Sequence, residues 1–243
     1  GALLSSAFSV IITHIVRPYR PRLTLGNLKK HVDFAAWTYL RSISVYIANA
    51  SDEFVVRSSA STAFFGIYHI ARDLARVLVS DLISPVREAM LPALSKMHED
   101  PVRRAIAISN IFGASVIVGT AVSFGIAATA PELVLVLLGS QWSAAAPFLS
   151  LLAIGVACNA IGEINQSSFV TAGMQKKSAY FWTLRALLTG IGCIAAGLLY
   201  GPKAIALTFT ILSALVLLIE TWYLFRALKI TASLMELSIR PLL

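Results

Sequence analysis

Six long apolar segments constrain the fold of this chain more than any other feature. They cover 32–55, 61–84, 104–129, 144–171, 178–200 and 204–226, and a shorter one covers 2–17. Each long segment reaches the roughly 20 apolar residues that a helix needs to cross a bilayer. They are too long and too rich in Ala and Leu for barrel strands, which alternate over about 10 residues. We therefore expect an all-α, polytopic membrane helix bundle with about six full transmembrane helices and one partial helix.

Charged residues are scarce. Of the 243 residues, 57% are hydrophobic and 13% are charged, whereas a soluble domain carries roughly 25% charged residues. The net charge of +8 does not predict nucleic-acid binding, because no nucleic-acid-binding motif is present and membrane proteins keep Lys and Arg for orientation. Cys158 and Cys193 lie within apolar segments, which favours free thiols over a disulfide or a metal site.

Basic residues in the connections predict the orientation of the helices. If the side of the connection at 17–31 is called inner, thirteen Lys and Arg fall on the inner side and only Arg57 and Lys203 on the outer side. The inner residues are Arg17, Arg20, Arg22, Lys29, Lys30, Lys96, Arg103, Arg104, Lys176, Lys177, Arg226, Lys229 and Arg240. This bias alternates correctly through all six segments, as the positive-inside rule requires.

Two connections are more than turns. The segment at 18–31 is basic and broken by proline, and we expect it along the inner headgroups, for orientation alone or for lipid recognition. The segment PELVLVLLGSQW at 131–142 is too short to span and is expected to be a surface helix or a re-entrant piece on the outer side. Interfacial aromatic belts are expected to hold the tryptophans: Trp37, Trp182 and Trp222 on the inner side and Trp142 on the outer side.

Five arginines remain inside the apolar segments or at their edges: Arg41, Arg72, Arg76, Arg87 and Arg185. Each would cost about 2.5–3.5 kcal/mol at the centre of a transmembrane helix on insertion scales, so lipid-facing positions are not expected. Arg185 and the acid Glu220 lie close to the inner ends of their segments, where we expect them to extend towards the headgroups.

The segment 61–84 and its continuation carry a polar stripe with a spacing of three or four residues, which places it on one helical face: Asp73, Arg76, Ser80, Ser84 and Arg87, bordered by Arg72. Two interpretations stay open. The charges satisfy one another, as intramembrane ionisable groups commonly do, through an i,i+3 pair of Asp73 with Arg76 and a contact of Arg87 with a neighbouring acid. Alternatively, they line an aqueous cavity. We favour pairing for the acids and a cavity that attracts an anion for the arginines, because the arginines outnumber such pairs.

Neighbouring segments offer matching polar residues. Arg41, Tyr46, Asn49, Asp52 and Glu53 interrupt 32–55, and Asn159, Glu163 and Gln166 recur at helical spacing in 144–171. Asn and Gln alone often join helices to one another, so contact between helices and the lining of a cavity are both open here. Pro85 and Pro92 are expected to bend the second helix.

Motifs of the common enzyme classes are absent from the sequence. There is no P-loop, HExxH, GxSxG or zinc-type Cys/His spacing, and the four histidines are scattered. No connection exceeds about 20 residues, so a soluble catalytic domain has no room between the helices. We expect no catalytic residue, no metal and no cofactor.

Several motifs resemble one transporter family. They are an Asp-x-hydrophobic start at 52–55, a Gly-x-Tyr at 66–68, a Leu-Pro-Ala-Leu-Ser at 91–95 and a Leu-Leu-Gly-x-x-Trp at 137–142. This arrangement resembles the C-terminal half of bacterial lipopolysaccharide, O-antigen and exopolysaccharide flippases of the multidrug/oligosaccharidyl-lipid/polysaccharide exporter superfamily. The resemblance covers nearly the whole chain.

The resemblance implies a domain organisation. Residues 1–17 would be the end of the sixth transmembrane helix, 18–31 a basic cytoplasmic linker, 32–226 the six-helix second lobe, and 227–243 a cytoplasmic or interfacial tail leading to a further helix. The family places a cavity between two such lobes and works by alternating access. On this basis the chain alone would not transport.

The resemblance also implies a substrate, a polyprenyl-diphosphate-linked oligosaccharide moved across the bacterial inner membrane for polysaccharide or lipopolysaccharide biosynthesis. Cavity residues that bind substrate would be Arg41, Tyr46, Asn49, Arg72, Arg76 and Arg87, because guanidinium groups suit phosphate oxygens. Residues that balance charge or bind a coupling ion, H⁺ or Na⁺, would be Asp52, Asp73, Asp81 and Glu163. Membrane lipids and the polysaccharide polymerase machinery are expected partners. The alternatives are a cation-coupled multidrug exporter of the same superfamily and, less favoured, a membrane glycosyltransferase or polymerase.

Overall fold

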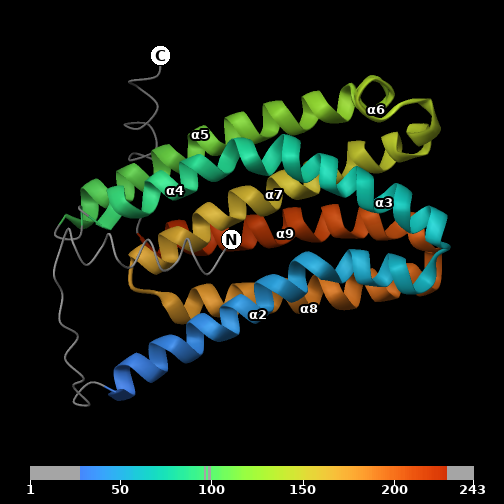
Figure 1. The fold of residues 1–243 in the computed structure, drawn as a ribbon. Coiled ribbons are helices and arrows are strands. Elements are labelled where there is room, and N and C mark those ends of the chain that lie inside the picture. The colour runs from blue at the N-terminus through green and yellow to red at the C-terminus, as the bar shows by residue number, and fades with distance from the viewer. Residues whose placement is uncertain (1–27, 96, 98–99, 229–243) are drawn as a thin grey trace, which may run out of the picture. The chain divides into compact units, whose positions relative to one another are not determined.

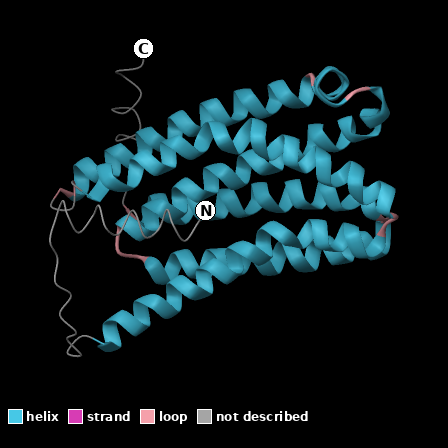
Figure 2. Ribbon diagram, in the orientation of Figure 1, coloured by secondary structure: helices cyan, strands magenta, loops and turns pink. Residues whose placement is uncertain are grey.

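The structure, a computed structural model, describes residues 28–95, 97 and 100–228. The chain divides into two compact units, 1–36 and 37–243. The predicted partial helix at 2–17 and nearly all of the tail at 227–243 lie outside the described residues. Every regular element among the described residues is a helix (Figure 2), which confirms the all-α prediction for this part of the chain.

The helices follow the six apolar segments closely. In order they are α2 (Leu28–Ser59), α3 (Thr62–Ala75), the π-helix η2 (Arg76–Ser80), α4 (Asp81–Ser95), α5 (Pro101–Ala128), α6 (Ala130–Leu138), the 3-10 helix η3 (Ser140–Ala145), α7 (Ala146–Thr171), α8 (Gln175–Tyr200) and α9 (Pro202–Ala227). The second predicted helix is longer than expected, because helical structure runs without a break from 62 to 95. Its first residues form α3, and the predicted prolines lie inside α4.

Successive long helices run in opposite directions (Figure 1). The turns after α2 and after α8, together with α6 and η3, therefore lie at one end of the second unit, and the turns after α4 and α7 lie at the other end. This up-and-down order places Arg103, Arg104, Lys176 and Lys177 at the end opposite to Arg57 and Lys203, the separation that the charge pattern predicts.

Local sequence explains where the helices begin and end. The hydroxyl of Ser61 accepts the backbone N–H of Phe64 at 3.3 Å and caps α3. The carboxylate of Asp100 accepts the N–H of Arg103 at 2.9 Å and caps α5, because Asp and Ser satisfy N–H groups that the first turn leaves unpaired. Gly201, with φ of 80°, separates α8 from α9 in a backbone conformation that favours glycine.

Helix α7 is the centre of the second unit. It packs against α3, η2, α4, α5, α8 and α9, and more of its apolar stretch is buried than in the other apolar helices. Small residues permit these close contacts: a Cβ atom at Gly155 would lie 2.9 Å from the Phe209 ring on α9. At Gly119 on α5, a Cβ atom would lie 3.0 Å from the Ile161 side chain of α7.

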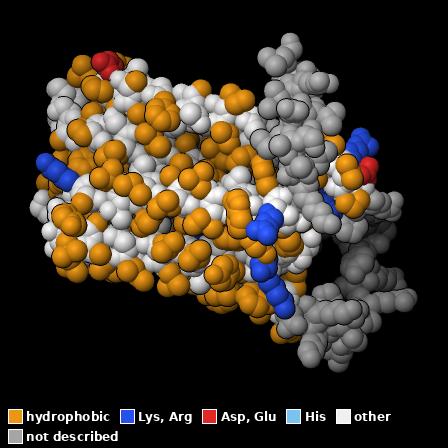
Figure 3. Space-filling model, turned by 180° about the vertical axis from the view of Figure 1, so that it is seen from behind, with side chains coloured by type: hydrophobic (Ala, Val, Ile, Leu, Met, Phe, Trp, Pro, Cys, Tyr) orange, Lys and Arg blue, Asp and Glu red, His pale blue; other side chains and the backbone are white. Residues whose placement is uncertain are grey.

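Much of the outer surface is apolar. Large exposed side chains include Ile117, Phe124, Ile191, Leu198 and Leu218, and Figure 3 shows hydrophobic groups over much of one face with few charged ones. Four helical stretches of the described chain are long and apolar enough to cross a membrane: Pro101–Ala128, Ser140–Thr171, Gln175–Tyr200 and Lys203–Ala227. Charged residues interrupt α2 and the run from α3 to α4. That these two helical segments cross the membrane stays a prediction.

Candidate functional site: a charged cavity inside the bundle

A cavity of about 530 Å³ lies between α2, the run from α3 to α4, and α7. Its wall is formed by Tyr46, Asn49, Ala50, Glu53, Arg72, Arg76, Ser80, Asp81, Ile83, Ser84, Arg87, Val156, Asn159, Ala160 and Glu163. Seven of the ten predicted site residues are in this wall: Tyr46, Asn49, Arg72, Arg76, Asp81, Arg87 and Glu163. The structure therefore brings together residues that are more than one hundred positions apart in the sequence.

The π-helix η2 shapes the wall contributed by the second helix. A π turn holds one more residue than an α turn and occurs often at functional sites. Around this wider turn, the adjacent residues Ser80 and Asp81 both reach the cavity, as do Ile83 and Ser84. The predicted stripe is thus broader than an ideal helix would allow.

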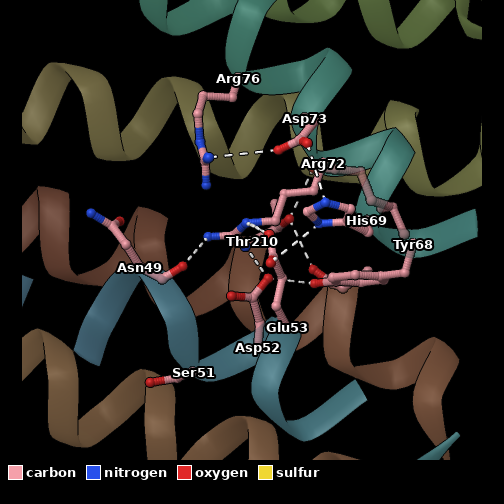
Figure 4. Close-up of polar contacts among 12 residues, drawn as sticks. Asn49, Ser51, Asp52, Glu53, Tyr68, His69, Arg72, Asp73, Arg76 and Thr210 are labelled. Carbon is pink, nitrogen blue, oxygen red and sulfur yellow. Dashed lines mark hydrogen bonds and ion pairs between the residues drawn. The ribbon is translucent and has the colours of Figure 1, made fainter. Parts of the chain in front are cut away.

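Arg72 is buried, with 3% of its side chain exposed, and joins α3 to α2 and α9 (Figure 4). Its guanidinium group pairs with Asp52 and lies 3.1 Å from Glu53, and it donates to the backbone carbonyl of Asn49 at 2.8 Å. The guanidinium carbon of Arg72 also lies over the Phe209 ring of α9, 4.6 Å from the ring centroid. Most of this guanidinium group is therefore occupied by the protein itself.

Asp52 lies behind the cavity wall rather than in it. Its carboxylate is fully buried and accepts the hydroxyl of Tyr68 at 2.6 Å in addition to its pair with Arg72. Both donors contact the same carboxylate oxygen, Oδ2, while Oδ1 is buried and accepts no hydrogen bond from the described residues. This arrangement gives Asp52 a structural contact between α2 and α3.

His69 lies between two carboxylates beside the cavity (Figure 4). Its Nδ1 atom is 3.3 Å from Glu53 on α2, and its Nε2 atom is 3.3 Å from Asp73 on α3. Asp73 also lies 3.6 Å from Arg76, the i,i+3 pair that the sequence predicts. Sequence reasoning missed His69, although its i,i+4 relation to Asp73 was a signal that could have found it.

Arg87 and Glu163 form a second ion pair, between α4 and α7, as expected for a neighbouring acid. Both residues also line a smaller pocket of about 220 Å³ together with Arg41, Ser42, Val45 and Trp182. Arg41 therefore lies in the adjacent pocket and not in the main cavity. The predicted cavity arginines therefore line two pockets, and Arg87 and Glu163 belong to the walls of both.

The main cavity is balanced in formal charge. Its wall holds three arginines (Arg72, Arg76 and Arg87) and three acids (Glu53, Asp81 and Glu163). Among the described residues, four of the five arginines that the sequence places inside or at the edges of apolar segments have an acidic partner. Fewer arginines are thus unpaired than the sequence analysis expected.

Arg185 and Glu220 depart from the expectation that they extend towards the headgroups. Arg185 is 1% exposed and Glu220 is fully buried, and their side chains pair at 3.2 Å between α8 and α9. Arg185 also donates to Asn159 on α7 and stacks on Trp182. The expectation was wrong because packing brings an acid, an amide and an aromatic face to this guanidinium group inside the bundle. Trp182, at 1% exposed, is correspondingly no part of an interfacial belt.

No metal-type or disulfide arrangement involves the cysteines of the described chain. Cys158 and Cys193 are free thiols, half-buried and buried respectively, as predicted.

Comparison with known proteins identifies the family of this chain. The family model of the polysaccharide biosynthesis proteins matches residues 1–147. The chain is 29% identical over 191 residues to the succinoglycan biosynthesis transport protein ExoT of Rhizobium meliloti (strain 1021), an alignment that covers 76% of this chain and 37% of that protein. It is 25% identical over 173 residues to an uncharacterized membrane protein in the cps region of Klebsiella pneumoniae, covering 68% of this chain and 36% of that protein.

The alignments cover only part of the relatives. The aligned part of the chain spans little more than a third of the length of the two curated relatives. No solved structure matches the chain. The family match covers more than half of the chain and includes α2 to α6 with much of the cavity wall. On this evidence the chain is a multi-pass, all-α membrane protein that belongs to the polysaccharide biosynthesis protein family.

Proposed function

We propose that the chain is the second lobe of a transporter for polysaccharide export. Its substrate would be a polyprenyl-diphosphate-linked oligosaccharide, moved from the inner to the outer leaflet of the bacterial inner membrane by alternating access. Family membership and the transport protein among its relatives support this proposal. In this proposal residues 32–226 form the six-helix lobe, and the full-length protein transports and does not catalyse a reaction.

The observation that carries the proposal is a cavity inside the bundle whose wall includes three guanidinium groups. Guanidinium groups donate in a planar fork that matches phosphate oxygens. A charged wall buried among apolar helices is costly, so its presence is better explained by a polar ligand than by packing. The volume of about 530 Å³ lies within the usual range for ligand sites.

The arginines would have different roles. Arg76 is the most available, because its side chain is 52% exposed and its only ion pair among the described residues is the 3.6 Å contact with Asp73. Arg87 is 35% exposed and could exchange Glu163 for a phosphate oxygen. We assign these two to the diphosphate, Arg72 to positioning the wall, and Arg41 to the adjacent pocket.

The remaining predicted residues fit supporting roles. Tyr46 is 75% exposed and offers an aromatic face, and Asn49 offers an amide to sugar hydroxyls. Asp52, Asp73 and Glu163 hold arginines in place, and Asp81 contributes the remaining negative charge to the wall.

The test is transport of a labelled lipid-linked oligosaccharide by the full-length protein in vesicles. Two lost charge-assisted hydrogen bonds of about 1.5–3 kcal/mol each predict that the double variant Arg76→Ala, Arg87→Ala slows transport at least about 100-fold. Arg103→Ala, an exposed arginine at the start of α5, is the matched control and should transport normally. If the double variant is folded and transports at the wild-type rate, the assignment of the arginines is wrong.

A cation-coupled multidrug exporter is the second candidate. The balanced charge of the cavity favours it to a degree, because Asp81 lines the wall and makes no ion pair among the described residues. Such an acid could attract a cationic drug. Expression in a drug-sensitive host decides: increased drug resistance that Asp81→Asn abolishes would support the exporter and contradict the flippase.

A further inference from the structure

Two irregular turns flank a short segment of the second helix, residues 81–84. Before this segment lies the π-helix η2, Arg76–Ser80, whose wider turn holds one surplus residue compared with an α turn. After it lies Pro85, inside α4, which has no N–H group to donate to the carbonyl of Asp81. The segment 81–84 is therefore joined to the rest of the helix through an irregular turn on each side.

This segment carries an acid of the cavity wall that has no ion pair. Asp81 is exposed and lines the cavity, but it pairs with no basic group among the described residues. The other two acids of the wall, Glu53 and Glu163, each lie within ion-pair distance of an arginine. With Asp81 the wall has three arginines and three acids, and without it the formal charge would be +1. The position of Asp81 thus decides whether the cavity is neutral or positive.

A shift of the surplus residue from η2 to the turn before Pro85 would rotate this segment alone. Successive residues of an α-helix are ~100° apart, so if η2 became an α turn, each residue of the segment would take the place of the next one. Asp81 would then take the place of Leu82, and Leu82 that of Ile83. The second exchange keeps an apolar side chain of the same size beside α5, which packed cores tolerate well.

The rest of α4 is expected to stay in place. Met90 and Leu94 are each 1% exposed, and a rotation of the whole of α4 would replace them in the core by Ala89 and Ala93. That exchange would lose buried apolar area. Pro85 offers the surplus residue a nearer position, because a backbone hydrogen bond is missing there already.

One cost opposes the rotation. The side chain of Leu82 is 57% exposed, so in its place the carboxylate of Asp81 would leave the cavity for the apolar outer surface. A charge on such a surface is costly within a membrane. The observed arrangement is therefore the more stable of the two until another interaction offsets this cost.

We propose that the segment 81–84 rotates and withdraws Asp81 from the cavity wall when a phosphate-type anion binds. Withdrawal removes a like charge from beside the anion, so the anion binds the rotated arrangement more tightly. Such a difference in affinity is what allows a ligand to shift a conformational equilibrium. Return of Asp81 restores the neutral wall and favours release. This inference rests on the proposed anion-binding function of the cavity.

The experiment detects which residue of the segment faces Gly119 of α5. A Cβ atom at Gly119 would lie 3.3 Å from the Cδ1 atom of Ile83. In the observed arrangement, Gly119→Cys should therefore cross-link with Ile83→Cys through a short bis(methanethiosulfonate), and in the rotated arrangement with Leu82→Cys. Both pairs are made in the full-length protein without its other cysteines, in detergent at constant ionic strength. Saturating sulfate should raise the yield of the Leu82 pair relative to the Ile83 pair about tenfold, within the usual range of about 5- to 150-fold for coupled sites.

Removal of the surplus residue gives a second measurement. Deletion of Val77, which is 58% exposed, leaves residues 81–95 in their observed places with no surplus residue to move. Because Asp81 cannot leave the wall, this variant should bind sulfate about tenfold more weakly than the wild-type protein, as measured by the sulfate-dependent shift in thermal unfolding. Val77→Ala keeps the length of η2 and is the matched control, with the wild-type affinity.

The outcomes separate the two proposals. If Arg76→Ala binds sulfate as well as the wild-type protein does, the anion site itself is wrong. If Arg76→Ala weakens binding but sulfate leaves the cross-linking ratio unchanged, the anion site stands and the rotation of the segment 81–84 is wrong. Wild-type sulfate affinity in a folded deletion variant would also contradict the rotation. If the deletion variant does not fold, the cross-linking ratio decides by itself.

Discussion

Replacement of Glu220 by alanine should destabilise the bundle by about 3–5 kcal/mol, the usual cost of removing one member of a buried ion pair. Glu220 is fully buried, and its carboxylate lies 3.2 Å from a guanidinium nitrogen of Arg185. The substitution leaves that guanidinium group inside the bundle with one amide acceptor, Asn159, and the ring of Trp182. An uncompensated buried charge, and not the lost carboxylate alone, determines the effect.

The distance gives an independent estimate. Two unit charges at 3.2 Å interact by about 5 kcal/mol at an effective dielectric constant of about 20. The desolvation of both groups offsets much of this energy, so removal of both charges should cost far less than removal of one. We therefore expect Arg185→Met, Glu220→Leu to be close to neutral.

The assay is unfolding of the purified protein in mixed detergent micelles, with Arg185→Met, Glu220→Leu and the double variant arranged as a cycle. The coupling energy should exceed about 2 kcal/mol, as for residues in one buried network. Lys203→Ala, an exposed basic residue at the start of α9, is the control and should change stability by less than about 0.5 kcal/mol. Single variants that are additive and each within that same small range would refute a buried pair and restore an interfacial position.

Two further predictions test the same interior. Gly162→Ala should lower the free energy of unfolding by about 1–3 kcal/mol, as overpacking of a core does. The reason is that a Cβ atom at this position would lie 2.7 Å from a guanidinium nitrogen of Arg185. A thermal unfolding temperature equal to the wild-type value would contradict this contact. Arg76→Cys should react with a membrane-impermeant maleimide because it lines the cavity, whereas Ile191→Cys, which is as exposed but lies on the apolar surface of α8, should react slowly. Equal labelling of the two cysteines in membranes would argue against a water-filled cavity.

Several local features followed from the sequence because they depend on near neighbours. Helix α8 ends at Tyr200, as the segment 178–200 predicts, because apolar length and a glycine at a positive φ define its end. The pair of Asp73 with Arg76 was predicted because residues three apart share a helical face. The partner of Arg87 could be described only as an acid from another helix, because spacing along one helix does not select among neighbouring helices.

Long-range contacts explain what the sequence did not predict. Arg185 and Glu220 are 35 residues apart, and nothing in either segment shows that α8 and α9 bring them face to face. Their position near the ends of apolar segments suggested contact with headgroups, yet packing buries both. His69 had no assigned role because its second carboxylate, Glu53, comes from another helix.

By itself the sequence determined the helix class, the number and approximate positions of the long helices, the alternation of basic connections and the composition of the polar stripe, because these depend on hydrophobicity and on 3.6-residue periodicity. Tertiary structure alone decided which charges are partners, which arginine stays available and which acid lies behind the wall. The physical reason is that a charge in an apolar bundle is stabilised by whichever oppositely charged group packing brings within a few ångströms. That group usually comes from a different helix.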